Sequence, residues 1–444
     1  MPNSVVLVNS LSGAIDEVTL ECYRDLVEER LDPEMESYLS LRGHLTQLNE
    51  DEEKDLALEL WAELDKSARA RAAVVICPSM DCNFRCTYCF ERPLQSRIDA
   101  GFLEPGKVNM NVGQVKKIFQ AFPALVERHT SIRNTITLFG GEPLWARNYA
   151  VVAEIVQQAR SLGHTVSAIT NGFELSRFCE LLGPNGIGFI QVSLDGPASI
   201  HDQLRPTVAG GGTFDKILRE LESVVDIQGL QVQIRMNYDS RNLEKTPELL
   251  QLLSDRGIIG RSNVAFHANL ISMNHAHESK DYKTLKLLPI LSGQLQDIEL
   301  DCYTSGLRRD FVSALTGQSP LKHKAHFCAA TSGMYVFCPD RQIYACWEGI
   351  GEENSRLGSY DPTLNFDEAG MSRWHRRNAL AMPACQTCSH LFMCGGGCAI
   401  HALERTGEIN TSECDGLRKK YEIMVKNVME KEGSFPTTQL PIVA

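Results

Sequence analysis

Apolar residues recur along this chain with two different periods, and the alternation between the periods predicts its architecture. Between residues 73 and 272, short apolar runs are separated by stretches in which apolar residues recur at helical spacing. The predicted strands are 73–77, 136–140, 166–169, 188–194, 232–238 and 263–271. Strands that alternate with helices form a parallel sheet, whose active residues lie where the strands end. We therefore expect an α/β core over residues 71–310.

The first seventy residues have another pattern. Residues 5–8 and 14–20, joined by a turn, predict a β-hairpin, and a helix is expected at 21–30. A second β element is expected at 41–48, after which Asn49 caps a predicted helix over 51–70 that begins with acidic residues.

Composition narrows the class of protein. A chain of 444 residues suggests two or three domains, and 43% hydrophobic with 23% charged residues is typical of a globular protein. No signal peptide or membrane-spanning stretch is apparent, so we expect a cytoplasmic protein without a membrane partner. A net charge of −12 argues against nucleic acid as a partner. In a reducing compartment, fifteen cysteines indicate metal or catalytic sites rather than disulfides.

Three of these cysteines, Cys82, Cys86 and Cys89, have the spacing CxxxCxxC. Three thiolates can hold three irons of a four-iron cluster and leave the fourth iron open for chemistry. A zinc knuckle would need a fourth Cys or His close by, and no His lies between His44 and His129. The spacing resembles the radical S-adenosylmethionine (SAM) superfamily. The resemblance implies that SAM binds the open iron, that an electron cleaves it, and that the resulting 5′-deoxyadenosyl radical abstracts hydrogen from a substrate.

A second motif follows the second predicted strand, in the segment Gly140-Gly141-Glu142-Pro143. Glycines let backbone approach a ligand closely, and a carboxylate accepts hydrogen bonds from an ammonium group. The segment resembles the GGEP motif of the family, although alone it could be an ordinary turn. The resemblance implies that Gly140, Gly141 and Glu142 hold the methionyl amino group of SAM, and that Tyr88 packs near its adenine.

Polar residues also follow the third and fourth predicted strands. Asn171, Ser193 and Asp195 suit a ribose, and Arg205 suits the carboxylate of SAM. The family uses the pattern SLDGP…HD..R in this way, but Asp195 could instead serve the turn beside it, and Asp202 could cap a helix. Further candidates on the fifth strand are Arg235 and Asn237.

The cysteines near the end of the chain form a separate group, whose order resembles the SPASM domain. We expect this domain at 311–444. The resemblance implies two auxiliary four-iron clusters, the first held by Cys328, Cys346 and Cys398, and the second by Cys385, Cys388, Cys394 and Cys414. Zinc ribbons, which also use CxxC pairs, are the alternative.

Cys338 and Glu348 are further candidates for these sites. If the hairpin loop after Cys338 has two residues, its thiol faces away from Cys346, whereas an odd loop or bulge reverses this facing. Its role as fourth ligand of the first auxiliary cluster therefore stays open. Arg341 stands where the family has a glycine. Glu348 is a candidate catalytic residue, and Trp347 stands where sulfatase-maturing relatives have an Asp base. The other thiols, expected to be small buried hydrophobes, are Cys22, Cys77, Cys179 and Cys302.

Together these resemblances imply a partial (β/α)6 TIM barrel followed by a SPASM domain. Residues 1–70 resemble the winged-helix element by which peptide maturases recognise their precursors, although a simple cap over the barrel is the alternative. The implied function is oxidation of a ribosomally made precursor peptide to a cross-link such as a cysteine thioether, with an electron donor such as flavodoxin or ferredoxin. The alternatives are a sulfatase-maturing or small-molecule SPASM oxidase and, from another class, a non-catalytic iron–sulfur carrier.

Overall fold

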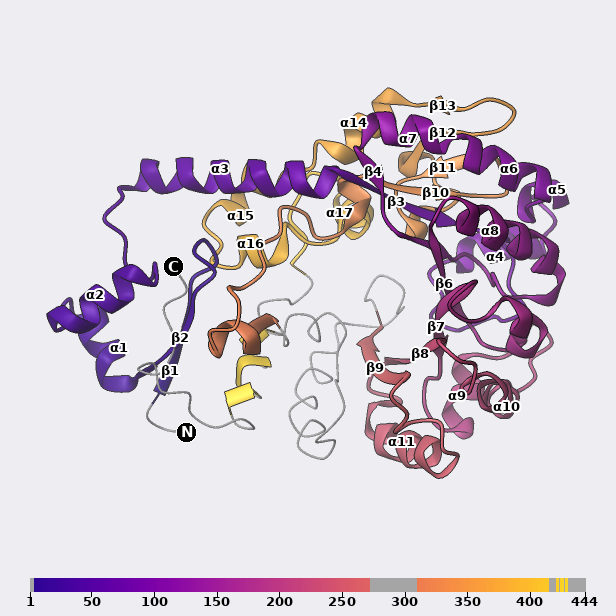
Figure 1. Ribbon diagram of the computed structural model, residues 1–444, viewed down its shortest axis with the longest axis horizontal. Helices are drawn as coiled ribbons and strands as arrows, with labels where there is room; N and C mark the ends of the chain where they lie inside the picture. The colour runs from indigo at the N-terminus through magenta and orange to yellow at the C-terminus, as the bar shows by residue number, and fades with distance from the viewer. Residues whose placement is uncertain (1–3, 272–309, 415–420, 423, 427, 430–444) are drawn as a thin grey trace. The chain divides into compact units, whose positions relative to one another are not determined.

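The computed structural model describes residues 4–271, 310–414, 421–422, 424–426 and 428–429. The chain divides into two compact units, and Figure 1 traces it through both. One, here called the barrel unit, comprises residues 69–301 and 329–376. The other, here called the composite unit, comprises residues 1–68, 302–328 and 377–444. Neither unit is continuous in sequence, whereas the three predicted domains follow one another along the chain. The functions assigned to those domains stay predictions.

A parallel sheet organises the barrel unit, and its central strands follow one another in chain order. All six predicted strands are confirmed. They are β3 (Arg71–Ile76), β5 (Thr135–Leu138), β6 (Thr165–Thr170), β7 (Ile187–Ser193), β8 (Gln231–Tyr238) and β9 (Val264–Leu270), and the short β4 (Ser131–Ile132) pairs with β3. The α/β fold with a parallel core is thus the one that the sequence predicts.

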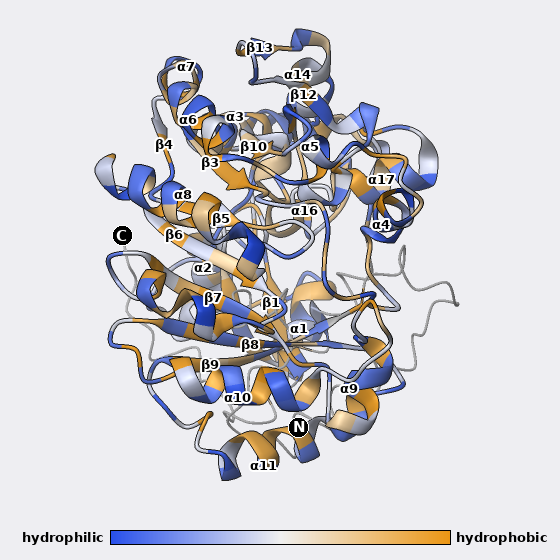
Figure 2. Cartoon of the chain, turned by 90° about the vertical axis from the view of Figure 1, so that its right-hand side faces the viewer, coloured by the Kyte–Doolittle hydropathy of each residue, from blue (hydrophilic) through white to orange (hydrophobic). Residues whose placement is uncertain are grey.

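Helices connect these strands and cover one face of the sheet. They are α4 (Arg92–Asp99), α5 (Pro105–Val108), α6 (Val112–Gln120), α7 (Phe122–Arg128), α8 (Tyr149–Ser161), α9 (Ala198–Leu204), α10 (Phe214–Val224) and α11 (Thr246–Asp255). In Figure 2, α8, α10 and α11 flank the strands and carry both hydrophobic and hydrophilic positions. Along β8, the residues at even-numbered positions are buried and those at odd-numbered positions after Gln231 are partly exposed, so polar side chains occupy the second face.

The sheet continues beyond β3, which the sequence did not predict. Strand β10 (Met334–Phe337) pairs in parallel with β3, and β11 (Gln342–Tyr344), β12 (Arg356–Ser359) and β13 (Asn365–Phe366) follow in antiparallel order before α14 (Glu368–His375). The first part of the predicted SPASM segment therefore completes the barrel unit, and the described sheet has eleven strands.

The β10–β11 hairpin has a three-residue loop, 339–341. Phe337 pairs with Ile343, and the N–H of Cys338 donates to the carbonyl of Gln342 at 3.1 Å. Arg341 has a φ of +71°, the left-handed conformation that favours glycine, and it stands where the SPASM resemblance expects glycine. The loop after Cys338 therefore has an odd number of residues, which is the second of the two cases considered from the sequence.

The composite unit begins with the predicted hairpin, β1 (Ser4–Val8) and β2 (Ile15–Thr19), followed by α1 (Leu20–Val27), α2 (Pro33–Leu41) and α3 (Glu50–Arg69). The side chain of Asn49 accepts hydrogen bonds from the N–H groups of Asp51 and Glu52, so the predicted cap of α3 is confirmed. Short helices in the C-terminal part are α15 (Pro383–Gln386), α16 (Leu391–Cys394) and α17 (Ala399–Thr406).

The second β element predicted at 41–48 is wrong. Asp32 accepts hydrogen bonds from Glu34 and Met35 and starts α2, which runs into this segment and is followed by irregular chain. Beyond the helix, Arg42 and His44 bind the buried carboxylate of Asp16, at 3.0 and 2.7 Å. Burial alone would raise the pKa of Asp16, but hydrogen bonds from His44 and other neighbours hold it below its usual value. A buried ion network therefore replaces the expected strand pairing.

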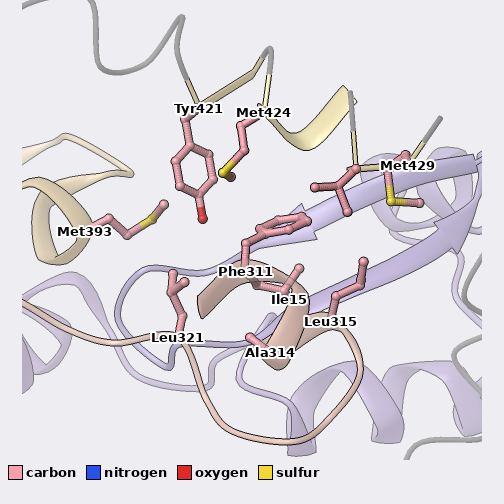
Figure 3. Close-up of a cluster of buried hydrophobic side chains, with 10 residues drawn as sticks. Ile15, Phe311, Ala314, Leu315, Leu321, Met393, Tyr421, Met424 and Met429 are labelled. Carbon is pink, nitrogen blue, oxygen red and sulfur yellow. The ribbon is translucent and has the colours of Figure 1, made fainter. Parts of the chain in front are cut away.

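Two hydrophobic cores hold the composite unit together. In the first, shown in Figure 3, Ile15 of β2 packs with Phe311, Leu321, Tyr421 and Met429. In the second, the apolar face of α3 packs on the segment that carries the C-terminal cysteines; its members from α3 are Ala57, Leu60, Trp61 and Leu64, and those from the C-terminal segment are Ala379, Leu380, Met382, Cys385, Leu391 and Phe392. The amino-terminal segment and the cysteine-rich segment thus share cores. In the described part of the chain, no helix is both long and apolar enough to cross a bilayer.

We predict that Leu60→Ala lowers the free energy of unfolding by about 1–2 kcal/mol, because it opens the core between α3 and the cysteine-rich segment. Leu58→Ala is the matched control, since Leu58 lies on the same helix and is 51% exposed, and its effect should stay within about 0.5 kcal/mol. Denaturant titration of the anaerobically purified protein measures both, and equal effects would contradict the packing role of α3.

Candidate active site

The segment that follows β3 carries Cys82, Cys86 and Cys89. Backbone hydrogen bonds pin it to the end of α9, since the N–H of Thr87 donates to the carbonyl of Leu204 at 2.9 Å. The three residues are only partly buried, yet protein atoms surround each thiol closely enough that burial raises all three pKa values. The ionised forms of Cys82, Cys86 and Cys89 also destabilise one another. The three thiols thus lie together in a place where only a bound cation would keep them as thiolates.

Packing between this segment and the turn after β5 explains the two glycines of the GGEP motif. A Cβ atom on Gly140 would lie 2.3 Å from Sγ of Cys77, and one on Gly141 would lie 2.1 Å from the carbonyl oxygen of Asp81. The N–H of Gly141 donates to the carbonyl of Ser79 at 2.9 Å. Both glycines are therefore required by protein backbone and thiol contacts, and their predicted contact with SAM stays a prediction.

Glu142, the next residue, joins the ends of β5 and β6. Its carboxylate accepts hydrogen bonds from the N–H of Leu144, the hydroxyl of Thr170 and the N–H of Asn171, at 2.8, 2.6 and 2.6 Å. Burial raises its pKa to about 7 against the opposing effect of these bonds. A carboxylate has about four acceptor positions, so capacity remains for a ligand ammonium group. Asn171 in turn donates to Oδ1 of Asn83 at 2.7 Å and so contacts the cysteine segment.

Glu91 is a buried acid at this site that the sequence did not single out. Burial and, second, the charge of Glu142 raise its pKa to about 8. Its Oε1 atom is buried and has no hydrogen-bond partner in the described residues. Only its position, two residues after Cys89, could have drawn attention to it.

Tyr88, Asp195, Arg205 and Asn237 meet in one hydrogen-bonded cluster. The hydroxyl of Tyr88 donates to Asp195 and accepts from Arg205 at 2.5 Å and from Asn237 at 3.2 Å. Asp195 is fully buried and also accepts from the N–H of Asn237 at 2.8 Å. Nε of Arg205 is buried and donates no hydrogen bond to any described residue. The four residues, all named from the sequence, come from the cysteine segment, the loop after β7, the end of α9 and strand β8, and Arg205 among them retains an unused donor.

His201, from the same motif, positions two members of this cluster. The N–H of Asp195 donates to its Nδ1 at 3.1 Å, and its Nε2 lies 3.1 Å from Thr213, whose hydroxyl donates to the carbonyl of Arg205 at 2.8 Å. Burial lowers the pKa of His201 well below its usual value, so the ring is neutral. Asp202 accepts hydrogen bonds from the N–H groups at the start of α10, which confirms the capping alternative.

Other predicted residues lie near the site with less defined contacts. Ser193 is the last residue of β7 and is in register with Arg235 on β8. Glu348 lies in the short helical turn that begins with Trp347. The ring of Trp347 stacks on Phe139, which stacks on Phe90, with centroid separations of 5.1 and 6.0 Å. This stack ties the residue after Cys346 to the residue after Cys89 within the barrel unit.

Cys338 is buried between β10 and β3, where its thiol shares a hydrogen bond with that of Cys77. Burial raises the pKa of Cys338 well above its usual value, and the charge of Cys77 adds to this effect. The thiol therefore has a partner in the barrel core, which favours a packing role. Its service as a cluster ligand stays a prediction.

Within the composite unit, the C-terminal cysteines surround a buried arginine. Arg377 is 3% exposed; burial lowers its pKa, while nearby thiols at Cys398, Cys385, Cys328 and Cys394 oppose that shift. The guanidinium donates to the carbonyl of Gly396 at 2.7 Å, and its NH1 atom has no hydrogen-bond partner among the described residues. A positive group at this position favours thiolates.

The turn after Cys394 is a second feature that favours a thiolate. Gly395, Gly396 and Gly397 all have positive φ angles, and the N–H groups of Gly396 and Gly397 donate to the sulfur of Cys394. Successive N–H groups in such a turn form an anion-binding concavity. Cys346 belongs to the barrel unit and the other six predicted auxiliary ligands to the composite unit, so both ligand sets stay predictions. In the described residues, no group of His, Cys, Asp or Glu side chains is arranged to hold a single metal ion.

The family model for the radical SAM superfamily matches residues 76–265, which span β3 to β9 and include every residue of the cysteine loop and of the Tyr88 cluster. The chain carries a radical SAM domain. This domain implies a four-iron cluster and SAM as cofactors, and it makes the chain an enzyme of radical chemistry. The partly buried thiols, the spare acceptor positions of Glu142 and the unused Nε of Arg205 are compatible with both cofactors.

Two curated relatives are similar to most of the chain. GTP 3′,8-cyclase of Rhizobium etli is 25% identical over 312 residues, which cover 66% of this chain and 79% of the relative. Pre-heme d1 synthase of Dinoroseobacter shibae is 22% identical over 355 residues, which cover 74% of this chain and 81% of the relative. Both names denote enzymes.

Solved structures share the fold. The protein anSMEcpe with bound AdoMet gives a TM-score of 0.61 at 16% identity, over 81% of this chain and 94% of that one. SuiB of Streptococcus suis bound to S-adenosylmethionine gives a TM-score of 0.54 at 14% identity, over 94% of this chain and 99% of that one. At these identities the likeness shows the fold alone.

Replacing Cys82, Cys86 and Cys89 together with Ala should remove one cluster's worth of iron and abolish cleavage of SAM, because three thiolates of one four-iron cluster are lost. Iron analysis and 5′-deoxyadenosine release under anaerobic conditions measure this. Cys179→Ala is the control, because Cys179 lies in the turn 175–181, outside the cysteine loop. Full iron content in the triple variant would contradict the assignment.

Proposed function

We propose that this enzyme is a radical SAM/SPASM maturase that oxidises a ribosomally made precursor peptide by forming a cysteine thioether. The observation that carries the proposal is the fold match to SuiB over nearly the whole length of both chains. SuiB has also been solved with its precursor peptide SuiA bound, and that structure gives a TM-score of 0.55 with this chain. The expected partners are a precursor peptide and an electron donor such as flavodoxin or ferredoxin.

The proposed cofactors are the SAM cluster and two auxiliary four-iron clusters. Cleavage of SAM supplies the radical that removes hydrogen from a substrate carbon. The barrel residues would orient SAM: Arg205 through its unused Nε, Glu142 through its spare acceptor positions, and Tyr88, Asn171, Ser193, Asp195 and Asn237 along the strand ends. For each thioether, one hydrogen atom would leave carbon and the thiol would lose a proton to solvent, and an auxiliary cluster held by the C-terminal cysteines would supply the acceptor for the remaining electron.

Several C-terminal thiols lie near Arg377, which supports the proposal of auxiliary clusters. A cluster with thiolate ligands is an anion, so a buried guanidinium with an unused N–H would stabilise it.

A second candidate function has support from the named relatives: GTP 3′,8-cyclase and pre-heme d1 synthase are small-molecule enzymes by name, which favours a small-molecule oxidase. A sulfatase-maturing activity, suggested by the fold match to anSMEcpe, is disfavoured by Trp347, whose ring belongs to the aromatic stack.

The product test separates these functions. We expect each modification to make the precursor lighter by two hydrogens and to remove one alkylatable thiol, because a carbon–sulfur bond replaces a C–H and an S–H bond. Mass spectrometry after thiol alkylation measures both quantities. Loss of two hydrogens with every cysteine still alkylatable would rule out the thioether, and turnover of a small molecule alone would rule out the peptide substrate.

Arg377→Met should lower the iron content of the purified enzyme and shift the reduction potential of the remaining auxiliary centres to more negative values, since a positive charge near the clusters is lost. Arg376→Met, the neighbouring arginine in sequence, is the control. Iron analysis and potentiometric titration followed by electron paramagnetic resonance report the change. Zinc in place of iron after anaerobic reconstitution would overturn the auxiliary clusters altogether.

A further inference from the structure

Three polar side chains on β8 and β9 have no role in the site described so far. Arg235 of β8 pairs in parallel register with His267 of β9, and Asn237 pairs with Asn269. Neighbouring strands lie about 4.8 Å apart, and residues two apart share a face. Since Asn237 contacts Tyr88 in the candidate SAM site, Arg235, His267 and Asn269 face the same side of the sheet, directly beside that site.

Arg235 carries a charge that no described acid balances. Its Nε donates to Oδ1 of Asn237 at 2.9 Å, and it forms no ion pair in the described part of the chain. Arg205 differs, because it pairs with Asp195 at 3.6 Å and donates to Tyr88. The terminal nitrogens of Arg235 therefore present a fork of N–H donors with a net positive charge on this face.

His267 and Asn269 are 8% and 7% exposed, and neither side chain has a hydrogen bond to a described residue. Buried polar groups are nearly always hydrogen-bonded, so their positions match a ligand that supplies acceptors and donors. Burial and, second, the charge of Arg235 lower the pKa of His267 to about 4. His267 is therefore neutral near pH 7 and adds hydrogen-bonding capacity without charge.

We propose that Arg235, His267 and Asn269 form a substrate subsite that binds one carboxylate group. A single guanidinium balances one negative charge and matches the planar geometry of a carboxylate through two parallel hydrogen bonds. A phosphate dianion would need further positive charge, which His267 does not provide. The carboxylate would belong to an acidic residue of the precursor peptide, so this part of the proposal rests on the proposed function. It would hold the peptide by that residue next to the place where SAM is cleaved.

Ligand-observed NMR on the anaerobic enzyme, saturated with 5′-deoxyadenosine and methionine, tests the subsite with defined probes. The probes are N-acetyl-aspartate methylamide, its asparagine analogue, succinate and inorganic phosphate. We expect the aspartate probe to bind about tenfold more tightly than the asparagine probe, the usual effect of a charge-assisted hydrogen bond. Arg235→Gln and Asn269→Asp should both remove the preference, the latter because its carboxylate would occupy Arg235, whereas Arg235→Lys should retain part of it.

Arg256→Gln is the matched control, because Arg256 is an exposed arginine paired with Glu222 at 3.0 Å, and it should leave the preference unchanged. Equal binding of the aspartate and asparagine probes, or tighter binding of phosphate, would each overturn the subsite. Binding of succinate without binding of the aspartate probe would keep the carboxylate subsite and overturn its peptide source, and with it the proposed peptide function.

Discussion

The contact between the cysteine segment and the turn after β5 is the constraint on which the site depends. Gly140 and Gly141 lie so close to Cys77 and Asp81 that no side chain fits at either position. Because the turn is held there, Glu142 enters the space between β5 and β6 and accepts hydrogen bonds from Thr170 and Asn171. Backbone packing therefore fixes where the three thiols lie relative to the strand ends, before any cofactor binds.

Electrostatics then divides the polar face of the sheet into two regions. In the Tyr88 cluster, Arg205 is balanced by Asp195, and neutral His201 holds both in place. On β8 and β9, Arg235 has no such partner in the described residues, and burial and, second, the charge of Arg235 lower the pKa of His267. A partly exposed positive charge without an acidic partner favours binding of an anion in this second region. We therefore expect this sheet edge to offer a balanced region for SAM and an unbalanced region for an acidic group.

The parts of the fold that sequence predicted were those with a strong local signal. The barrel strands are short apolar runs or, in β8, apolar residues at every second position, and each was found within two residues of its observed ends. Residues 41–48 were assigned to a strand because a buried acid 25 residues earlier, Asp16, leaves no mark on local periodicity. Strands β10 to β13 were missed as part of the sheet for a similar reason, since short strands after a cysteine motif do not reveal which edge they join.

The site was predicted to the extent that its residues stand in motifs. Cys82, Glu142, Asp195 and Arg205 could be named in advance because fixed spacings carry them. His267 and Asn269 are single polar residues in an apolar strand, a pattern that is as often structural as functional. Only the register of β9 against β8 places them beside Arg235.

In the composite unit, the amino-terminal segment and the cysteine-rich segment share hydrophobic cores, so their roles cannot be separated by deleting one of them. Helix α3 belongs to the segment expected to recognise the precursor, yet Leu60, Trp61 and Leu64 form one core with the segment that carries the C-terminal cysteines. Ile15 of the hairpin is buried with Phe311 and with Tyr421 of the C-terminal segment. Removal of the first 70 residues would therefore expose both cores, and a loss of activity on truncation would not identify a recognition role. Substitutions on exposed positions of β1 or α3, which leave these cores intact, are the changes that separate recognition of a peptide from stability of the cysteine-rich segment.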